Sequence, residues 1–258
     1  MDKPVLPAGV FGIEGVVKMR IAITGMDLAE GKVKYEDAIL FALADKFSPK
    51  KITPYYFEFA QDDYESANII VVTRERILDL LIHDIEKVET RRDRAADANE
   101  RKVLERVLAE LEREIPVCAV RLEEQEEACI RALSPFSFKP TLVIEPGEAD
   151  SAGITAHEVI SRAMAIANLM FFYTAGKKEV HAWLVPRGAN AQDCAGKIHS
   201  DLAQGFVKAE IIPAEDLLQC HGMQDARQRN LTRLVDRDFT IPENTVLEIR
   251  FNIGSGSR

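Results

Sequence analysis

The segment His199-Ser200-Asp201 holds the three residue types of a hydrolytic triad. In such a triad the imidazole accepts the proton of the serine hydroxyl, and the carboxylate orients the imidazole. Residues at i, i+1 and i+2 do not face one another on a helix, so these side chains cannot align for proton transfer. No loop that could hold an oxyanion accompanies them. We therefore expect His199 to make local hydrogen bonds that fix a turn between a helix and a strand, and we expect no catalytic residue here.

Cysteine and histidine side chains could also ligate a metal. Structural zinc sites present two pairs of ligands, each pair closely spaced. The candidates of the C-terminal part do not form two such pairs: Cys194, His199, Cys220 and His221. The chain has four cysteines and no CxxC pair, so we expect free thiols in a reducing compartment and no metal site.

Basic residues of the C-terminal third could bind phosphate groups. If this part binds RNA, the candidates for phosphate contacts are Lys178, Arg187 and Lys208, with Trp183 as a stacking platform. Further basic residues follow in the same part, and acidic residues are interleaved with them: Lys177, Lys197, Arg227, Arg229, Arg233 and Arg237, with Asp225, Asp236 and Asp238. A merely solvated charged surface, and a Trp183 that packs under a loop, are the alternatives.

The overall charge restricts the kinds of partner. The 258 residues carry a formal net charge of -9, and residues 170–258 are balanced, so the excess acid lies in the N-terminal two thirds. Such a chain does not favour non-specific binding to duplexes as a whole, although a local basic patch stays open. With 47% apolar and 29% charged residues it is typical of a globular protein.

The hydropathy pattern predicts a cytoplasmic protein without a membrane segment. The longest apolar stretch, near residues 163–173, is about half of the length that a membrane-spanning helix needs. The first residues lack the unbroken apolar run of a signal peptide.

Alternating apolar stretches and helical spacing predict an α/β sheet in the first part of the chain. The expected helix covers residues 35–47, and the expected strands cover residues 19–24, 55–59, 68–72 and 141–144. This order suggests a parallel or mixed sheet covered by helices. We expect a helix over residues 155–171, with Thr155 as its cap and Glu158 at the third position.

Two amphipathic stripes between these strands predict an antiparallel helical hairpin at about residues 75–115. Apolar residues recur at steps of three and four on both sides of a polar break at residues 91–100. The mixed signs of its charges are typical of a solvated helix face, and a partner-binding tip is the alternative.

The last part of the chain predicts a small mixed sheet crossed by a helix, a β-grasp-like module. Strand patterns cover residues 179–185, 206–212 and 246–253, and a short helix covers residues 191–199.

This C-terminal part resembles the TGS domain that closes the YchF-like, Obg-related P-loop nucleotidases. The resemblance runs through five segments: residues 171–176, 178–183, 195–201, 205–210 and 250–253. The upstream order of strands and the inserted hairpin are similar to the same family. The resemblance implies a nucleotide-binding domain followed by a module that works with tRNA, ribosomes or regulatory nucleotides.

The first strand is not followed by the phosphate-binding motif that such nucleotidases need, GxxxxGK[ST]. Gly25 is followed by five residues instead of four, and then by Gly31, Lys32 and Val33, which has no hydroxyl for a magnesium ion. About 20 residues separate the expected helix 35–47 from the strand 68–72, and no DxxG occurs among them. Where the family recognises the base, this chain has Glu145 and Glu148, and Glu145 cannot donate a hydrogen bond from an amide.

These departures predict a shortened YchF-like protein with a degenerate nucleotide site. We expect an N-terminal arm (1–18), a reduced P-loop-like Rossmannoid sheet with the hairpin (19–168), a β-grasp TGS domain (169–253) and a flexible tail (254–258). The vestigial nucleotide site would comprise Gly25, Gly31, Lys32 and Glu148.

The favoured interpretation of the function is a non-catalytic binding or regulatory module for a ribosome, RNA or a protein, without a cofactor. The alternative is a divergent protein that binds GTP or ATP with magnesium and hydrolyses it weakly through Lys32 and Glu148.

Overall fold

A computed structural model of the protein describes residues 18–148 and 153–252. These residues form two compact units. Unit 1 comprises residues 18–33 and 57–167, and unit 2 comprises residues 34–56 and 168–252. The expected tail, and the expected N-terminal arm except for Lys18, lie outside the described residues.

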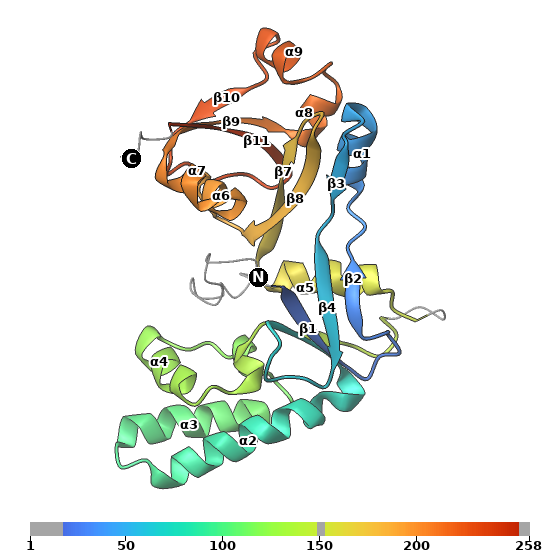
Figure 1. The fold of residues 1–258 in the computed structure, drawn as a ribbon. Helices are drawn as coiled ribbons and strands as arrows, with labels where there is room; N and C mark the ends of the chain where they lie inside the picture. The colour runs from blue at the N-terminus through green and yellow to red at the C-terminus, as the bar shows by residue number, and fades with distance from the viewer. Residues whose placement is uncertain (1–17, 149–152, 253–258) are drawn as a thin grey trace, which may run out of the picture. The chain divides into compact units, whose positions relative to one another are not determined.

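Unit 1 is built on a five-stranded sheet with the order β2-β4-β1-β5-β6 (Figure 1). Its strands are β1 (Met19–Thr24), β2 (Gly31–Lys34), β4 (Tyr56–Gln61), β5 (Ile69–Thr73) and β6 (Thr141–Ile144). The pairs β1–β4, β1–β5 and β5–β6 are parallel, in agreement with the prediction of a parallel or mixed sheet. Strand β2 was not predicted, because its four residues alternate between half-buried and exposed and leave no apolar run.

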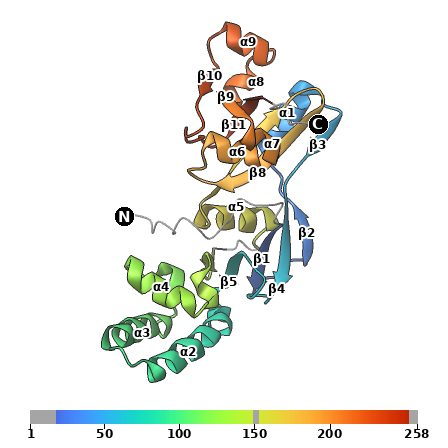
Figure 2. The ribbon, with the colours of Figure 1, turned by 60° about the vertical axis from the view of Figure 1, so that its left-hand side comes forward.

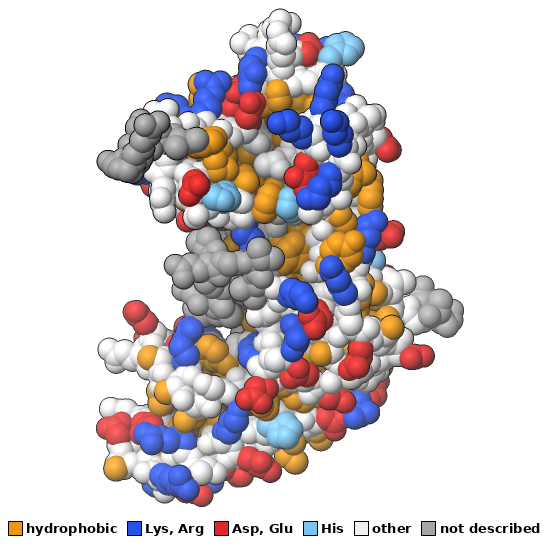
Figure 3. All heavy atoms as spheres, viewed as in Figure 1, with side chains coloured by type: hydrophobic (Ala, Val, Ile, Leu, Met, Phe, Trp, Pro, Cys, Tyr) orange, Lys and Arg blue, Asp and Glu red, His pale blue; other side chains and the backbone are white. Residues whose placement is uncertain are grey.

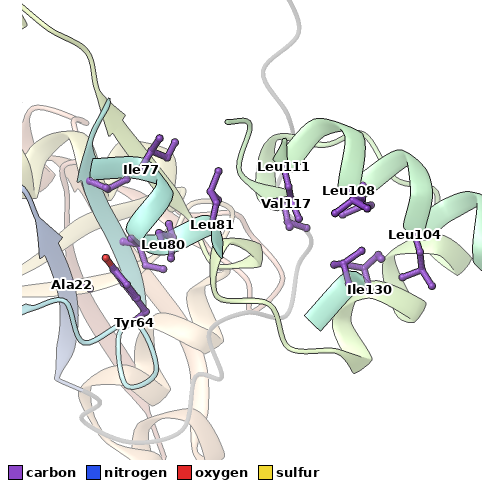
Figure 4. Close-up of a cluster of buried hydrophobic side chains, with 14 of the residues drawn as sticks. Ala22, Tyr64, Ile77, Leu80, Leu81, Leu104, Leu108, Leu111, Val117 and Ile130 are labelled. Carbon is purple, nitrogen blue, oxygen red and sulfur yellow. The ribbon is translucent and has the colours of Figure 1, made fainter. Parts of the chain in front are cut away.

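The predicted helical hairpin is present in unit 1. Its helices are α2 (Ile77–Arg94) and α3 (Ala98–Leu111), and α4 (Glu124–Ala132) packs on α3; short 3-10 turns cover Arg74–Arg76, Val117–Ala119 and Phe136–Phe138. Figure 4 shows Leu104 and Leu108 of α3 near Ile130 of α4, and Leu80 of α2 near Tyr64 and the sheet. These residues belong to one buried cluster that reaches Ala22 in β1. The hairpin therefore shares its hydrophobic core with one face of the sheet.

The opposite face of this sheet is covered by α5 (Ala156–Ile166), which packs on β5 and β6. Thr155 and Glu158 form the predicted capping box at its start. The prediction that this helix continues to Phe171 is wrong, because the helix ends at Ile166, with Ala167 as its C-cap, and Asn168 takes a left-handed conformation with φ 54°. The apolar run that follows is a strand buried on both sides, and hydropathy alone does not separate such a strand from a buried helix.

Unit 2 contains a six-stranded sheet with the order β10-β9-β11-β7-β8-β3. Its strands are β3 (Lys51–Thr53), β7 (Leu169–Ala175), β8 (Glu179–Pro186), β9 (Phe206–Pro213), β10 (Arg233–Val235) and β11 (Thr245–Phe251). Strands β3 and β11 run parallel to their neighbours β8 and β7, and the pairs β7–β8, β9–β11 and β9–β10 are antiparallel. The expected mixed sheet is thus present, with β3 and β10 added at its edges.

Helices cover both faces of the six-stranded sheet (Figure 2). The helices of unit 2 are α1 (Ala38–Phe47), α6 (Ala191–Ile198), α7 (Ser200–Gln204), α8 (Ala214–Leu218) and α9 (Met223–Gln228). Phe172 points toward α6 and joins its buried cluster, whereas the neighbouring Phe171 stacks on Tyr35, just before α1, at a centroid distance of 5.5 Å. This alternation follows from the two-residue period of a strand.

Residues 34–56 pack in unit 2, although they lie between two strands of unit 1 in the sequence. The hydroxyl of the buried Tyr173 in β7 donates to Asp37 Oδ2 at 2.8 Å. The other carboxylate oxygen of Asp37 accepts from the backbone N–H groups of Ile39 and Leu40 and caps α1. Burial, and secondarily the Asp37 carboxylate, raise the pKa of Tyr173, so its phenol stays a donor. One carboxylate therefore holds α1 both at its cap and against the sheet.

None of the helices in the described part of the chain is long and apolar enough to cross a membrane.

Replacement of Tyr173 by Phe is expected to lower the free energy of unfolding by about 1–3 kcal/mol, because it leaves a buried carboxylate oxygen without its donor. Asp37→Ala also removes the helix cap, which adds about 1 kcal/mol. Urea unfolding of both single variants and the double variant measures the coupling. The double variant should lose less than the sum of the two single losses, and simple additivity would contradict a direct interaction.

Candidate functional site

The parallel strands β1, β4, β5 and β6 end at one edge of the unit 1 sheet, which we call the carboxyl edge. From β1 the chain goes to β4 on one side and then to β5 on the other side, so the strand order reverses between β1 and β5. Open α/β sheets bind ligands outside the carboxyl ends of the strands at such a reversal. This point is therefore where a nucleotide site would be expected.

Gly25 follows β1 at this reversal, and its surroundings leave no room for a side chain. Its φ is +80°, and a Cβ atom would collide with Thr73 Oγ1 and lie 3.0 Å from Arg76 Cγ. Thr73 is the last residue of β5, and Arg76 follows this strand. The space beside Gly25 is thus occupied by side chains of the neighbouring strand end.

The loop after Gly25 is held by the end of β4. The Gln61 side-chain amide donates to Leu28 O at 3.2 Å, and its backbone N–H donates to Glu30 Oε1 at 2.6 Å. Gly31 and Lys32 then begin strand β2, which pairs with β4. A phosphate-binding loop instead leads into a helix whose free N–H groups face the phosphate. In this chain the residues Gly31 and Lys32 do not stand at a helix N-terminus.

Carboxylates surround this edge. Asp62 follows β4 and accepts a hydrogen bond from Thr24 Oγ1 at 2.7 Å, and the Thr24 hydroxyl also contacts the Tyr64 hydroxyl at 2.9 Å. Burial of Tyr64, and secondarily the charge of Asp62, raise the pKa of this phenol. Asp27 and Glu30 are exposed in the loop. Negative charges at these positions oppose the approach of a phosphate.

Glu148, the fourth residue of the predicted nucleotide site, is bound by an arginine. Its Oε2 accepts from Arg162 Nη2 at 2.7 Å and from the Glu145 backbone N–H at 3.0 Å, and these bonds lower its pKa. Glu145 in turn accepts from Arg74 Nε at 3.0 Å, which lowers the pKa of Glu145. Either carboxylate would have to leave its arginine before it could bind a base.

The sheet order separates the predicted nucleotide residues. Lys32 lies in β2 and Glu148 follows β6, and these are the two edge strands of the sheet. Four strand spacings of about 4.8 Å put them on the order of 19 Å apart. Gly25 lies between them at the end of β1. The structure therefore does not gather the four residues around one point.

The basic candidates of unit 2 differ in their partners. Arg187 forms a two-pronged ion pair with Glu243, with N–O distances of 2.6 and 2.8 Å. Lys208 donates to Asp236 at 2.9 Å. Lys178 is exposed in the turn between β7 and β8, and no acidic partner of it occurs among the described residues. Of the three predicted phosphate contacts, Lys178 has the least neutralised charge.

Trp183 is half-buried and packs on the α6 side of the sheet. Its Nε1–H donates to Thr174 Oγ1 at 3.1 Å, and its ring stacks on His181 with centroids 3.6 Å apart. Burial lowers the pKa of His181 to about 4, so this ring is neutral at pH 7. Lys208 alternates with Ala209 of the α6 cluster and so points to the other face of the sheet. Trp183 and Lys208 therefore do not share one surface.

Charge pairing that the sequence does not reveal neutralises part of the basic group. Glu210 is buried in β9 and accepts from Arg227 Nε at 2.8 Å and from Arg250 Nη2 at 2.9 Å. These bonds, first that of Arg227, lower the pKa of Glu210 to about 2. Alternation along the strand places Glu210 on the same face as Lys208. This alternation could have been recognised in the sequence, whereas the pairing of Glu210 with the two arginines could not.

In unit 1 the carboxylates at the carboxyl edge were not identified from the sequence as part of the site.

His199 makes the predicted local hydrogen bond, but the prediction that it fixes a turn between a helix and a strand is wrong, because a second helix follows it. His199 ends α6 and caps α7, where its Nδ1 accepts from the Asp201 backbone N–H at 3.1 Å. Within residues 18–148 and 153–252, no group of three or more acidic, histidine or cysteine side chains is arranged to hold a metal.

Comparison with known proteins relates both the sequence and the fold to one family. Residues 169–252 match the family model YchF-GTPase_C, described as a protein of unknown function. The chain is 31% identical over 221 residues to the ribosome-binding ATPase YchF of Escherichia coli O157:H7, an alignment that covers 67% of this chain and 61% of that protein. It is 32% identical over 161 residues to the Bacillus subtilis protein of the same name, which covers 62% of this chain and 42% of that one.

The fold is similar to that of the solved Schizosaccharomyces pombe YchF GTPase, with a TM-score of 0.69 and 15% identity, over 90% of this chain and 98% of that chain. The chain spans about three fifths of the length of the first curated relatives it matches.

Gly25→Ala is expected to destabilise the protein more than Gly31→Ala does. Both glycines have a positive φ, but only the Cβ at position 25 would collide with neighbouring atoms. The strain common to both costs about 1–2 kcal/mol, and the collision adds to it at position 25. Urea unfolding of both variants measures the difference. Equal losses would contradict the close packing of Gly25 against Thr73.

Proposed function

Because this chain is YchF-like in sequence and in fold, we propose that it acts as a ribosome-associated binding module that does not hydrolyse nucleotides. The proposal has two parts, the loss of nucleotide chemistry in unit 1 and the retention of a binding surface in unit 2.

The observation that carries the first part is the position of Lys32 in an edge strand. P-loop nucleotidases place a lysine against the β and γ phosphates at the start of the helix that follows the first strand. Lys32 stands two strands away from β1, and no helix starts after Gly25 among the residues up to β2. The carboxylates of Asp27, Glu30 and Asp62 support the same conclusion, because they would repel the phosphates.

The second part rests on the relatives and on the exposed lysine of unit 2. The bacterial relatives are named ribosome-binding, and the matching family model covers the part of unit 2 from residue 169 to residue 252. Ribosomal surfaces are rich in RNA phosphates, which exposed and unpaired cations attract. We place the RNA contact at Lys178 and its neighbour Lys177, both exposed in the turn between β7 and β8. Arg187 and Lys208 would first have to release Glu243 and Asp236.

A divergent nucleotide-binding protein is the second candidate, because the relatives are named as an ATPase and a GTPase. It would keep a nucleotide at the carboxyl edge of unit 1 by contacts other than a phosphate loop. Binding measurements separate it from the favoured proposal.

We expect ATP, GTP and their diphosphates with Mg²⁺ to leave the melting temperature unchanged. A ligand at 100 times its dissociation constant would stabilise the folded state by about 2.7 kcal/mol, which a thermal-shift scan detects. A rise that disappears in Lys32→Ala but persists in Lys102→Ala, an exposed control on α3, would contradict the proposal and favour the second candidate.

Sedimentation with purified ribosomes at several salt concentrations tests the binding surface. Replacing both Lys177 and Lys178 by Glu is expected to weaken the association and to lower the salt slope by about 1 for each RNA phosphate that the protein no longer neutralises. Arg101→Glu with Lys102→Glu on α3, which makes the same change of net charge at exposed positions, is the control in unit 1. Unchanged binding of the double variant would exclude this turn, and weakened binding of the control as well would indicate attraction by net charge alone.

A further inference from the structure

Two large aliphatic side chains are exposed on the outer face of α2. Leu78 and Ile82 retain 53% and 52% of their accessible surface. They stand four residues apart, so they are neighbours on one side of the helix. The other apolar residues of α2 are buried or half-buried in the cluster that this helix shares with the sheet, for example Leu80 and Leu81. The exposed pair is therefore not part of that cluster.

Carboxylates border this pair. Glu75, Asp79 and Glu86 are exposed at or near α2, at positions that the helical period puts next to Leu78 and Ile82. Arg76 forms an ion pair with Asp79, and the remaining two carboxylates have no basic partner among the ion pairs of the described residues. Figure 3 shows red acidic side chains gathered around a pale blue histidine near the lower end of the unit 1 sheet.

An open pocket continues the same surface toward the sheet. It is lined by Asp62, Asp63, Tyr64, Glu65, Arg76, Asp79, His83 and Phe136. Its aromatic rings lie close together, with Phe136 6.0 Å from Tyr64 and 5.8 Å from His83 between centroids. The Lys87 ammonium lies 3.9 Å from the centre of the Phe136 ring, so a cation of the chain itself already covers this ring. Of the rim carboxylates, Asp63 and Asp79 pair with Arg20 and Arg76, whereas Asp62 and Glu65 form no ion pair among the described residues and suit the charge of a lysine or arginine side chain.

We propose that this part of unit 1 is a docking surface for a basic amphipathic protein segment. Apolar side chains of the segment would cover Leu78 and Ile82, its flanking lysines or arginines would pair with Glu75 and Glu86, and one basic side chain would enter the pocket beside Tyr64. Charge decides between kinds of partner. An RNA would bring phosphates against these carboxylates, and the same face of a second copy would bring carboxylates against carboxylates. The inference does not depend on the proposed function, because it uses a different unit and different charges.

The test uses the full chain and a synthetic helical peptide of leucine and lysine, with leucines at i, i+3 and i+4 and lysines elsewhere. Fluorescence anisotropy of the labelled peptide measures its dissociation constant. The variant with Leu78→Ser and Ile82→Ser should bind at least tenfold more weakly, because the peptide leucines then bury less apolar surface. Leu234→Ser, a change of an exposed leucine in unit 2, should leave the dissociation constant unchanged. Both side chains lie outside the buried cluster, so the double variant should remain folded, which its cooperative thermal unfolding checks.

A charge exchange tests the carboxylates separately. Glu75→Lys with Glu86→Lys should weaken the leucine–lysine peptide at least tenfold and should bind a leucine–glutamate peptide of the same pattern more tightly than the unaltered chain does. Glu215→Lys with Asp238→Lys makes the same change of net charge at exposed positions of unit 2 and should have little effect.

Three results would overturn the proposal. One is equal weakening by the Glu75→Lys, Glu86→Lys variant and by its control in unit 2, which would indicate attraction by net charge. Another is unchanged binding after removal of the two aliphatic side chains. The third is a single-stranded RNA that binds to the unaltered chain and binds more weakly to the Leu78→Ser, Ile82→Ser variant, which would assign the surface to nucleic acid.

Discussion

The buried hydrogen bond between Tyr173 and Asp37 holds α1 against the sheet of unit 2 and so bears on which helices unit 1 has. Together with the pairing of β3 with β8 and the stacking of Tyr35 on Phe171, it holds residues 34–56 in unit 2. The chain of unit 1 therefore has no helix of its own between β1 and β4, and the segment after β1 consists of a loop and the edge strand β2. A phosphate site needs a helix N-terminus at this point of the sheet. The absence of one is thus a consequence of where α1 is packed.

The strands and helices that bury long apolar stretches could be predicted from the sequence. The strand β1, the hairpin of α2 and α3, and the capping box of α5 each have a local pattern with one physical meaning. The apolar pattern of Leu169–Ala175 has two possible meanings, because a strand covered on both faces and a buried helix are equally apolar. The short edge strands β2, β3 and β10 could not be predicted, because they are stabilised by pairing with strands that are distant in the sequence and their own residues show no strand pattern.

For the candidate site, too, the sequence reveals features of neighbouring residues and does not reveal contacts between residues that are far apart in the chain. The sequence shows that no GxxxxGK[ST] motif begins at Gly25 and that basic residues occur in the last third. It does not contain the pairing of those residues, since Arg187 and Glu243 are separated by 56 positions and Lys208 and Asp236 by 28. Whether a cation attracts a phosphate depends on whether a carboxylate has already neutralised it. Counting basic residues therefore overestimates the positive charge of unit 2 that is available to a ligand, and of the three predicted phosphate contacts only Lys178 has no acidic partner among the described residues.

The fold of unit 1 does not require a nucleotide at its carboxyl edge. Its core is formed by residues such as Ile21, Ile70 and Leu80, which are fully buried between the sheet and the helices. Burial of such side chains stabilises the sheet whatever charges stand at the strand ends, where Asp62 and Glu148 contact water as well as their partners. The edge can therefore hold the carboxylates of Asp62 and Glu148 without loss of core stability. The turn at Lys178 and the acidic face of α2 are likewise outside this core, so the interactions proposed for them place no demand on the packing that stabilises the fold.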